Sequence, residues 1–281
     1  MAGTLYICGT PIGNLEDMTY RAVRVLAEAD IIAAEDTRNS IKLLNHFDIH
    51  TPLTSYHEFN KTEKAEELCD RLAEGRDIAL ITDAGMPAVS DPGEELVAMA
   101  AERGFDIRVV PGPTACVSAL AVSGLPTGRF AFEAFLPKDK KKRESVLESL
   151  RDETRTIIMY EAPHHLIATL KELGKYLGAD RRIALCRELT KVHEEALRTT
   201  IGEALVHYDE EAPRGEFVLV IEGRSFKELE EESRRKWDEV DIKSHVEMYE
   251  KKGMDHKAAM KQAATDRGVP KREIYNALHK K

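Results

Sequence analysis

Short apolar runs alternate with amphipathic stretches along the first 124 residues of the chain. Runs of four or five apolar residues are typical of buried strands, and the longer stretches between them repeat their apolar positions with a helical period. The pattern predicts strands at 4–8, 31–34, 78–82 and 107–110, and helices at 20–29, 39–47, 61–73, 93–103 and 114–123. Because strands and helices alternate, we expect a mainly parallel sheet with both faces covered.

The pattern changes after a Gly- and Pro-containing segment at 124–128, because the predicted strands then follow one another more directly. Strands are predicted at 130–135, 156–160, 183–188, 196–200 and 215–221, with helices ending at 150, 173 and 208. We therefore expect a second α/β domain with a mixed sheet. The predicted domains are an N-terminal α/β domain at 1–124, a second at 125–225 and a helical C-terminal module at 226–281.

The C-terminal module is predicted to consist of helices at 226–241, 244–252, 255–266 and 271–280. Short helices joined by three-residue turns are typical of a helix-turn-helix module, although a plain three-helix cap has the same pattern. Residues 251–281 carry nine Lys and Arg against three Asp and Glu. This local positive charge suits contact with RNA, and a solvated helix face explains it equally well.

Three loops that combine Gly with Pro follow predicted strands of the N-terminal domain, at 9–14, 83–93 and 111–115. Ligands of open parallel sheets bind at the carboxyl ends of the strands, where such loops meet. Proline fixes φ and glycine permits conformations that other residues avoid, so these loops are both kinked and stiff. They match neither the dinucleotide fingerprint nor the phosphate-binding P-loop. The sequence therefore predicts a cofactor site of another kind.

Charged and titratable side chains follow two further segments. Glu35, Asp36 and Arg38 come directly after a predicted buried strand, where charges are costly unless they pair or act in catalysis. An acidic helix N-terminus, or an Asp36–Arg38 ion pair that only shapes the loop, explains them equally well. His57 is a candidate titratable group at the rim of a site, and a helix entry capped by Asn60 is the alternative.

Composition narrows the class of protein. The net charge of −9 argues against indiscriminate binding of polyanions, although the lysine-rich segment 138–143 supplies a local basic face. The four cysteines are far apart and the histidines lack a zinc spacing, so we expect buried thiols, a reducing compartment and no metal site. No apolar run approaches the roughly 20 residues of a membrane span, and no secretory signal is visible. We expect a cytoplasmic protein.

A distinctive set of Gly, Pro and charged residues occurs in seven segments: TPIGNL at 10–15, AEDTR at 34–38, SYHE at 55–58, DAGMPAVSDPG at 83–93, VPGP at 110–113, EAPH at 161–164 and RELTK at 187–191. As an ordered set, these segments resemble the ribosomal RNA small subunit methyltransferase I family. That family belongs to the tetrapyrrole-methylase-like (class III) methyltransferases that depend on S-adenosyl-L-methionine. The resemblance covers about residues 3–223, and the C-terminal helices also look like those of the family.

The resemblance implies a bilobal, tetrapyrrole-methylase-like α/β fold, usually in a homodimer, with S-adenosyl-L-methionine held in the cleft between the lobes. It implies 2′-O-methylation of the ribose of a decoding-region cytidine of 16S rRNA within the small ribosomal subunit. Carried over by position, the implied cofactor contacts are Pro11, Gly85, Met86, Ala88, Ser90, Thr114, Ala115, Tyr160, Leu189 and Gly215. The chain departs from the family pattern at Phe59, where a second His is expected.

A ribose hydroxyl is a poor nucleophile, so the reaction needs alignment and a general base. The candidates for the base are Glu35, Asp36 and His57, with Arg38 as an anchor for an RNA phosphate or for the two carboxylates. A small-molecule methyltransferase acting on a tetrapyrrole is the alternative function, and a non-catalytic RNA-binding module is a further one. The basic segments argue against the first alternative, and the intact Gly and Pro of the three loops argue against the second.

Overall fold

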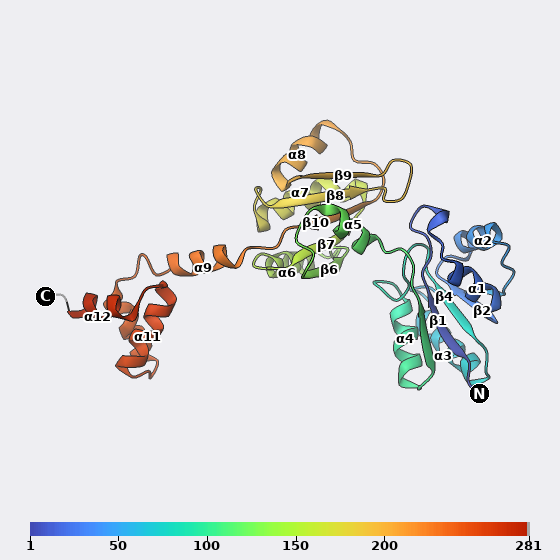
Figure 1. The fold of residues 1–281 in the computed structure, drawn as a ribbon, viewed down its shortest axis with the longest axis horizontal. Helices are drawn as coiled ribbons and strands as arrows, with labels where there is room; N and C mark the ends of the chain where they lie inside the picture. Colours follow the sequence, from blue (N-terminus) through green and yellow to red (C-terminus); the bar gives the residue numbers. More distant parts are fainter. Residues whose placement is uncertain (280–281) are drawn as a thin grey trace. The chain divides into compact units, whose positions relative to one another are not determined.

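The computed structural model describes residues 1–279 (Figure 1). The chain forms two compact units, of which the first comprises residues 1–148 and 156–222. The second comprises residues 149–155 and the segment that begins at Gly223. The first unit contains two five-stranded sheets, and the second contains the C-terminal helices. The predicted division into domains at 1–124, 125–225 and 226–281 remains a proposal.

The first sheet has the strand order β3-β2-β4-β1-β5, and every neighbouring pair is parallel. Its strands are β1 (Thr4–Cys8), β2 (Ile31–Ala34), β3 (Leu53–Ser55), β4 (Ile78–Ile81) and β5 (Asp106–Val110). The mainly parallel sheet expected from the alternating pattern is therefore confirmed. The pattern missed β3, because this edge strand has three half-buried residues and too little apolar periodicity to be seen.

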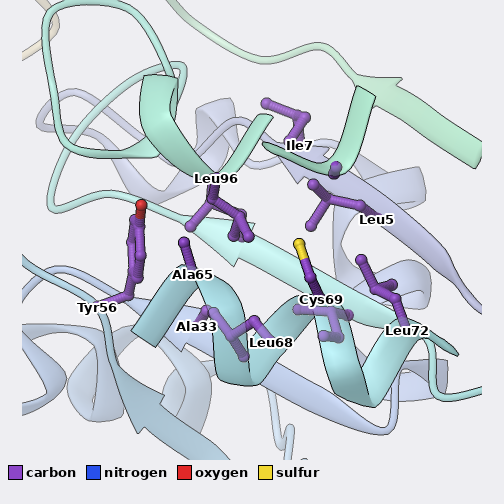
Figure 2. Close-up of a cluster of buried hydrophobic side chains, with 12 residues drawn as sticks. Leu5, Ile7, Ala33, Tyr56, Ala65, Leu68, Cys69, Leu72 and Leu96 are labelled. Atoms are coloured by element: carbon purple, nitrogen blue, oxygen red, sulfur yellow. The ribbon is translucent and has the colours of Figure 1, made fainter. Parts of the chain in front are cut away.

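Helices cover both faces of this sheet (Figure 1). They are α1 (Tyr20–Glu28), α2 (Thr37–His46), α3 (Lys61–Ala73) and α4 (Gly93–Glu102), preceded by the short 3-10 helix η1 (Leu15–Asp17). Successive strand residues face opposite sides. In β4, Ile78 and Leu80 pack with α3 and α4, whereas Ala79 and Ile81 pack with α1 and α2. Figure 2 shows the α3–α4 side of this core, in which Tyr56 is buried beside Ala65 and Leu96.

The second sheet has the order β6-β7-β10-β8-β9, with β6 and β7 parallel and the other pairs antiparallel. Its strands are β6 (Phe130–Ala134), β7 (Thr156–Glu161), β8 (Arg182–Arg187), β9 (Glu195–Thr200) and β10 (Phe217–Ile221). The expected mixed sheet is confirmed. The accompanying helices are α5 (Ala115–Ser123), α6 (Lys140–Leu150), α7 (Pro163–Leu177) and α8 (Ile201–Glu210).

Helix α5 packs on the second sheet, through contacts of Cys116, Ala119 and Leu120 with β7, β8 and β10. The chain therefore passes from one sheet to the other before α5, in the loop that contains Gly112. A short rigid connection of this kind places the carboxyl ends of both sets of strands within reach of each other.

The second unit is built from α9 (Phe226–Arg235), α10 (Ile242–Lys251), α11 (His256–Arg267) and α12 (Lys271–His279). The last three helices pack around a core that includes Val246, Met260 and Ile274. Helix α9 ends before the predicted residue 241, because Asp241 accepts a hydrogen bond from the backbone N–H of Ser244 and so caps α10. The predicted end of the last helix, at residue 280, lies outside the described residues.

Within residues 1–279, none of the helices combines the length and the apolar character that a membrane crossing requires. The four cysteines, Cys8, Cys69, Cys116 and Cys186, are buried free thiols, as expected. Burial raises the pKa of the Cys186 thiol to about 11, so these side chains behave as small apolar core residues.

Candidate functional site

The carboxyl ends of strands from both sheets line a cavity of about 660 Å³ within the first unit. This volume lies in the range of about 300–1,000 Å³ that is typical of small-molecule and cofactor sites. The cavity is lined by the first residues of the antiparallel strand β10 and by segments at the carboxyl ends of seven other strands: β1, β2, β4, β5, β6, β7 and β8. The topology of both sheets therefore converges on one site.

Strained backbone surrounds this cavity. Six non-glycine residues of the described chain have a left-handed φ between 50° and 67°. One of them is Asp48, and the other five lie in segments that line the cavity: Ala88, Ser90, Ala134, Glu188 and Thr190. Each such residue costs about 1–3 kcal/mol and persists only where surrounding contacts hold it, which is typical of ligand-binding sites.

Hydrogen bonds lock the loops of the first sheet together. Thr10 and Gly85 exchange backbone hydrogen bonds of 2.9 and 3.2 Å, which joins the first loop to the loop after β4. The Asp91 carboxylate accepts hydrogen bonds from the backbone N–H groups of Ala88 and Gly93, at 2.9 and 2.7 Å. The backbone N–H of Gly9 also donates to the carbonyl of Val110 at 3.0 Å, so the first loop is tied to the loops after β4 and β5.

Carboxylates dominate the charge of the cavity. Among the described residues that line it, six are acidic and one is basic: Glu35, Asp83, Asp91, Glu161, Glu188 and Glu216, with Lys191. Lys191 Nζ lies 2.9 Å from Glu188 Oε1 and 2.9 Å from Glu216 Oε2, so its charge is already matched. The backbone N–H of Glu216 and the Lys191 ammonium hold the pKa of Glu188 below its usual value. The resulting negative potential favours a ligand that carries positive charge.

Apolar side chains provide the remaining walls, including Ile12, Leu189, Phe217 and Val218. Leu189, Phe217 and Val218 are themselves buried. An apolar pocket with a few oriented polar groups can bind an uncharged ring beside a cationic group.

Of the predicted catalytic residues, Glu35 lines the cavity. The Thr82 hydroxyl donates a hydrogen bond of 2.7 Å to Glu35 Oε2, which fixes the orientation of the carboxylate. Asp83 also lines the cavity and accepts a hydrogen bond of 3.2 Å from the backbone N–H of Asp36. The segment after β2 is thereby held to the segment after β4.

Asp36 and Arg38 are engaged with each other and do not line the cavity. Arg38 Nε and Nη2 donate to the two oxygens of Asp36, at 3.0 and 2.7 Å, and the backbone N–H of Arg38 donates to the same carboxylate. These bonds lower the pKa of Asp36 to about 2 and make it the cap of α2. The geometry thus favours the ion pair that shapes the loop.

His57 lies after β3 and is not among the residues that line the cavity. Its backbone N–H donates to Asn60 Oδ1 at 2.8 Å, and its buried Nδ1 has no hydrogen-bond partner. Asn60 precedes α3 as expected, but its side chain bonds to His57 and Ser55 instead of capping the helix. Asn60 therefore shapes the loop.

The structure brings most of the predicted cofactor contacts to the cavity. Seven of them line it: Gly85, Met86, Ser90, Thr114, Ala115, Tyr160 and Leu189. The other three, Pro11, Ala88 and Gly215, each adjoin a residue that lines it, namely Ile12, Val89 and Glu216.

The predicted site residues did not include several lining residues with polar or aromatic side chains: Asp83, Phe135, Glu161, Glu188, Lys191 and Glu216. Asp83 nevertheless begins one of the loops predicted to form the cofactor site. Position was the available signal for Glu161 and Glu188, because each ends or directly follows a strand next to a predicted contact, and for Asp83, because it begins the loop at 83–93. For Phe135 the sequence carries no such signal, because the irregularity of β6 that precedes it is visible only in the pairing of strands.

Comparison with known proteins gives three consistent results. The family model for tetrapyrrole (corrin/porphyrin) methylases matches residues 4–205. The chain is 54 % identical to a ribosomal RNA small subunit methyltransferase I of Halalkalibacterium halodurans, over 99 % of this chain and 95 % of the relative. It is 47 % identical to the protein of that name from Bacillus subtilis, over 99 % of this chain and 94 % of the relative.

Solved structures with low sequence identity share the fold. A uroporphyrin-III C-methyltransferase from Thermus thermophilus, complexed with S-adenyl homocysteine, is 20 % identical with a TM-score of 0.54, covering 78 % of this chain and 97 % of that one. A diphthine synthase is 14 % identical with a TM-score of 0.63, covering 78 % of this chain and 90 % of that one.

Proposed function

The chain belongs to the tetrapyrrole methylase family and, within it, to the ribosomal RNA small subunit methyltransferases I, and from this premise we propose a specific reaction. The protein transfers a methyl group from S-adenosyl-L-methionine to the ribose 2′-oxygen of a decoding-region cytidine of 16S rRNA. The observation that carries the proposal is the identity of 54 % and 47 %, over 99 % of this chain, to two proteins named ribosomal RNA small subunit methyltransferase I. That identity supports this function over the tetrapyrrole alternative.

The cavity fits the cofactor chemically. S-adenosyl-L-methionine carries a sulfonium and an ammonium charge beside an adenine ring, and the cavity combines an excess of carboxylates with apolar walls. The loop at 83–93 lines the cavity and has left-handed backbone at Ala88 and Ser90, so we assign backbone N–H and C=O groups of this loop as contacts for the cofactor. We assign the cofactor contacts to the ten residues predicted for them, and we add Asp83 as a partner for a polar or charged group.

Glu35 is the proposed general base. When bound, S-adenosyl-L-methionine supplies an electrophilic methyl group. The Glu35 carboxylate, oriented by Thr82, accepts the proton of the ribose 2′-hydroxyl as the oxygen becomes nucleophilic. Positioned general bases contribute about 10²–10⁴-fold to the rate. Holding the hydroxyl in line is worth up to roughly 7–11 kcal/mol, and the rigid loops around the cavity serve this purpose.

Asp36, Arg38 and His57 are assigned supporting roles. Asp36 holds α2 and Arg38 in place, and a carboxylate with a pKa of about 2 is a weak base. The Arg38 side chain is 87 % exposed and retains N–H donors beyond its bond with Asp36, so it can anchor an RNA phosphate. We place His57 at the rim of the RNA site.

RNA contacts are proposed for the lysine-rich segment 138–143 and for the C-terminal helices. A protein that ends after Val240 tests the second contact, because it lacks α10–α12 but keeps the bonds of Arg224 to Asp152 and Glu232. We expect weaker binding of the RNA substrate and unchanged affinity for S-adenosyl-L-methionine. Equal loss of both affinities would show that these helices serve only the fold.

A homodimer is the proposed assembly. Helix α5 is apolar around its circumference, yet Val117 and Val122 are 51 % and 38 % exposed, and Val109 of the edge strand β5 is 60 % exposed. Helices that are apolar on every side are normally buried, so a second copy that covers the exposed valines of α5 fits the pattern. Light scattering tests it, because a mass of 31.6 kDa would be that of a single chain. Because the proposed substrate is ribosomal RNA, we propose that the protein acts in the cytoplasm.

Labelled S-adenosyl-L-methionine provides the decisive assay. The protein is incubated with small ribosomal subunits from a strain lacking this gene, with naked 16S rRNA, or with a uroporphyrinogen. We expect label in the subunits, at a cytidine whose 3′ linkage becomes resistant to alkali because its 2′-oxygen is methylated. Label in the tetrapyrrole, or on a nucleobase, would contradict the proposal.

A further inference from the structure

We propose that Phe135 is a stacking platform for a nucleobase of the RNA substrate at the mouth of the cavity; this inference rests on the proposed function. Phe135 lines the cavity and is nevertheless 59 % exposed. Proteins that bind single-stranded nucleic acid stack successive bases on aromatic side chains, so an exposed ring at this cavity is suited to that role.

A local irregularity of β6 precedes this ring. Phe132 pairs with Ile158 and Ala134 pairs with Met159, so Glu133 is an extra residue that has no partner on β7. Ala134 follows with a φ of 50°, in the left-handed region. Such β-bulges bend a strand and re-aim the next side chain, and they are common beside active sites. The backbone thus departs from regular strand geometry at the residue before Phe135.

Aromatic packing holds the ring against Tyr160. The ring centroids of Phe135 and Tyr160 are 5.6 Å apart with an angle of 62° between the planes. Tyr160 is held in turn by Phe132, at 5.0 Å and 67°. The Phe135 ring therefore has a fixed neighbour, while more than half of its surface stays open to a ligand. A preorganised ring of this kind can stack on a base at small entropic cost.

The chemistry next to the ring favours RNA over the cofactor. Lys138 is three residues further along the chain, and Lys141 and Lys142 are also exposed at the start of α6. Phosphates neutralised by such lysines position a strand, and its bases then stack on nearby aromatic rings. The cofactor contacts assigned above lie on other segments, in the loops of the first sheet and at the ends of β7, β8 and β10.

The test compares two substitutions of the same residue. Phe135→Leu keeps an apolar side chain but removes the ring, and Phe135→Trp keeps an aromatic face. We measure kcat and KM on small ribosomal subunits, and Kd for S-adenosyl-L-methionine by calorimetry. Loss of one stacked base lowers kcat/KM by roughly 5- to 150-fold for the Leu variant. The Trp variant should stay within about threefold of the wild type, and both should keep the cofactor Kd.

Phe130→Leu is the matched control, because Phe130 is a 42 % exposed phenylalanine on the same strand that does not line the cavity. Its kcat/KM should equal that of the wild type. An unchanged Phe135→Leu enzyme, equal losses in the Leu and Trp variants, or a weakened cofactor Kd would each overturn the inference. A wild type without activity on subunits would instead overturn the proposed function.

A photoreactive benzoylphenylalanine at position 135 provides a second measurement that does not depend on the folding of the Leu variant. Irradiation of its complex with small subunits should cross-link the side chain to 16S rRNA at or next to the methylated cytidine. A cross-link confined to ribosomal proteins or to distant RNA would contradict the inference.

Discussion

The Thr82 hydroxyl donates a hydrogen bond of 2.7 Å to Glu35 Oε2, across the carboxyl ends of the neighbouring strands β4 and β2. Thr82 is buried, and Glu35 reaches the cavity. The bond gives the carboxylate one orientation before any substrate arrives. A preorganised base of this kind loses little entropy when the reaction begins.

Glu35→Gln should therefore separate catalysis from binding. The amide can still accept the Thr82 hydrogen bond but cannot take a proton, so we expect kcat to fall by about 10²–10⁴-fold with cofactor Kd unchanged. Asp36→Asn removes a carboxylate that is bound to Arg38, and we expect a smaller loss, mainly in KM for RNA. Full turnover in both variants would exclude both carboxylates as the base.

Gly9→Ala should disturb the cavity by forcing apart the loops that follow β1 and β5. A Cβ at Gly9 would lie 2.7 Å from both Cα and N of Gly112, which is a contact with backbone that cannot rotate away. Because the two loops would have to separate, we expect a loss of about 1–3 kcal/mol in the free energy of unfolding and weaker cofactor binding. Gly128→Ala is the control, since its Cβ would have no neighbour within 4 Å. Equal melting temperatures for the two variants would refute the steric argument.

The lysines at the start of α6 should govern the salt dependence of RNA binding. Each phosphate contact contributes about 0.7–0.9 to the slope of log K against log salt. Lys141→Gln combined with Lys142→Gln should thus flatten the slope by roughly 1.5 if both contact phosphates. The matched control changes Lys171 and Lys175, which are exposed on α7, to Gln. The lysine-rich segment would have no RNA role if both double variants kept the slope of the wild type.

The C-terminal helices should lose stability in mildly acidic solution. His245 is fully buried, stacks on Trp237 at 3.6 Å, and lies 3.2 Å from Asp266 and 3.1 Å from Arg267 Nε. Arg267 donates to Nδ1, so His245 is neutral with its proton on Nε2 toward Asp266. Burial lowers the pKa of His245, and the nearby Arg267 charge adds to this, while Asp266 opposes it. Tyr249 also faces this group, through its hydrogen bond to Asp266.

The sign of the effect follows from proton uptake. With the folded pKa of His245 below the unfolded value of about 6.5, the unfolded state binds more protons as pH falls through that range. The free energy of unfolding therefore has its full value above about pH 6.5. Below that pH it decreases, by at most about 1.4 kcal/mol per pH unit for one proton. Trp237 is the single tryptophan, so its fluorescence during urea unfolding reports on this unit. Identical midpoints at pH 5.5 and 7.5 would contradict the prediction, and a His245→Gln variant should show no such slope.

Local patterns predicted most of the secondary structure, because most helices and strands have a periodic apolar pattern or a capping residue of their own. Thr19 accepts a hydrogen bond from the backbone N–H of Ala22 and so starts α1 at Tyr20, where the apolar pattern predicts the helix. Short elements with mixed polarity, such as β3, carry too weak a signal. The helix predicted at 226–241 ends at Arg235 instead, and Asp241 caps α10 through its hydrogen bond with Ser244.

The amino-acid sequence by itself determined the alternation of strands and helices, the parallel and mixed sheets, and the stiff loops after β1, β4 and β5, because each depends on periodicity or on the restricted φ of Gly and Pro. Tertiary structure alone decided which polar groups share the cavity. It separated Glu35 from Asp36, although they are neighbours in the chain, because successive residues after a strand face different surroundings. It also brought Phe135 to the cavity through a bulge, which exists only in the pairing of two strands.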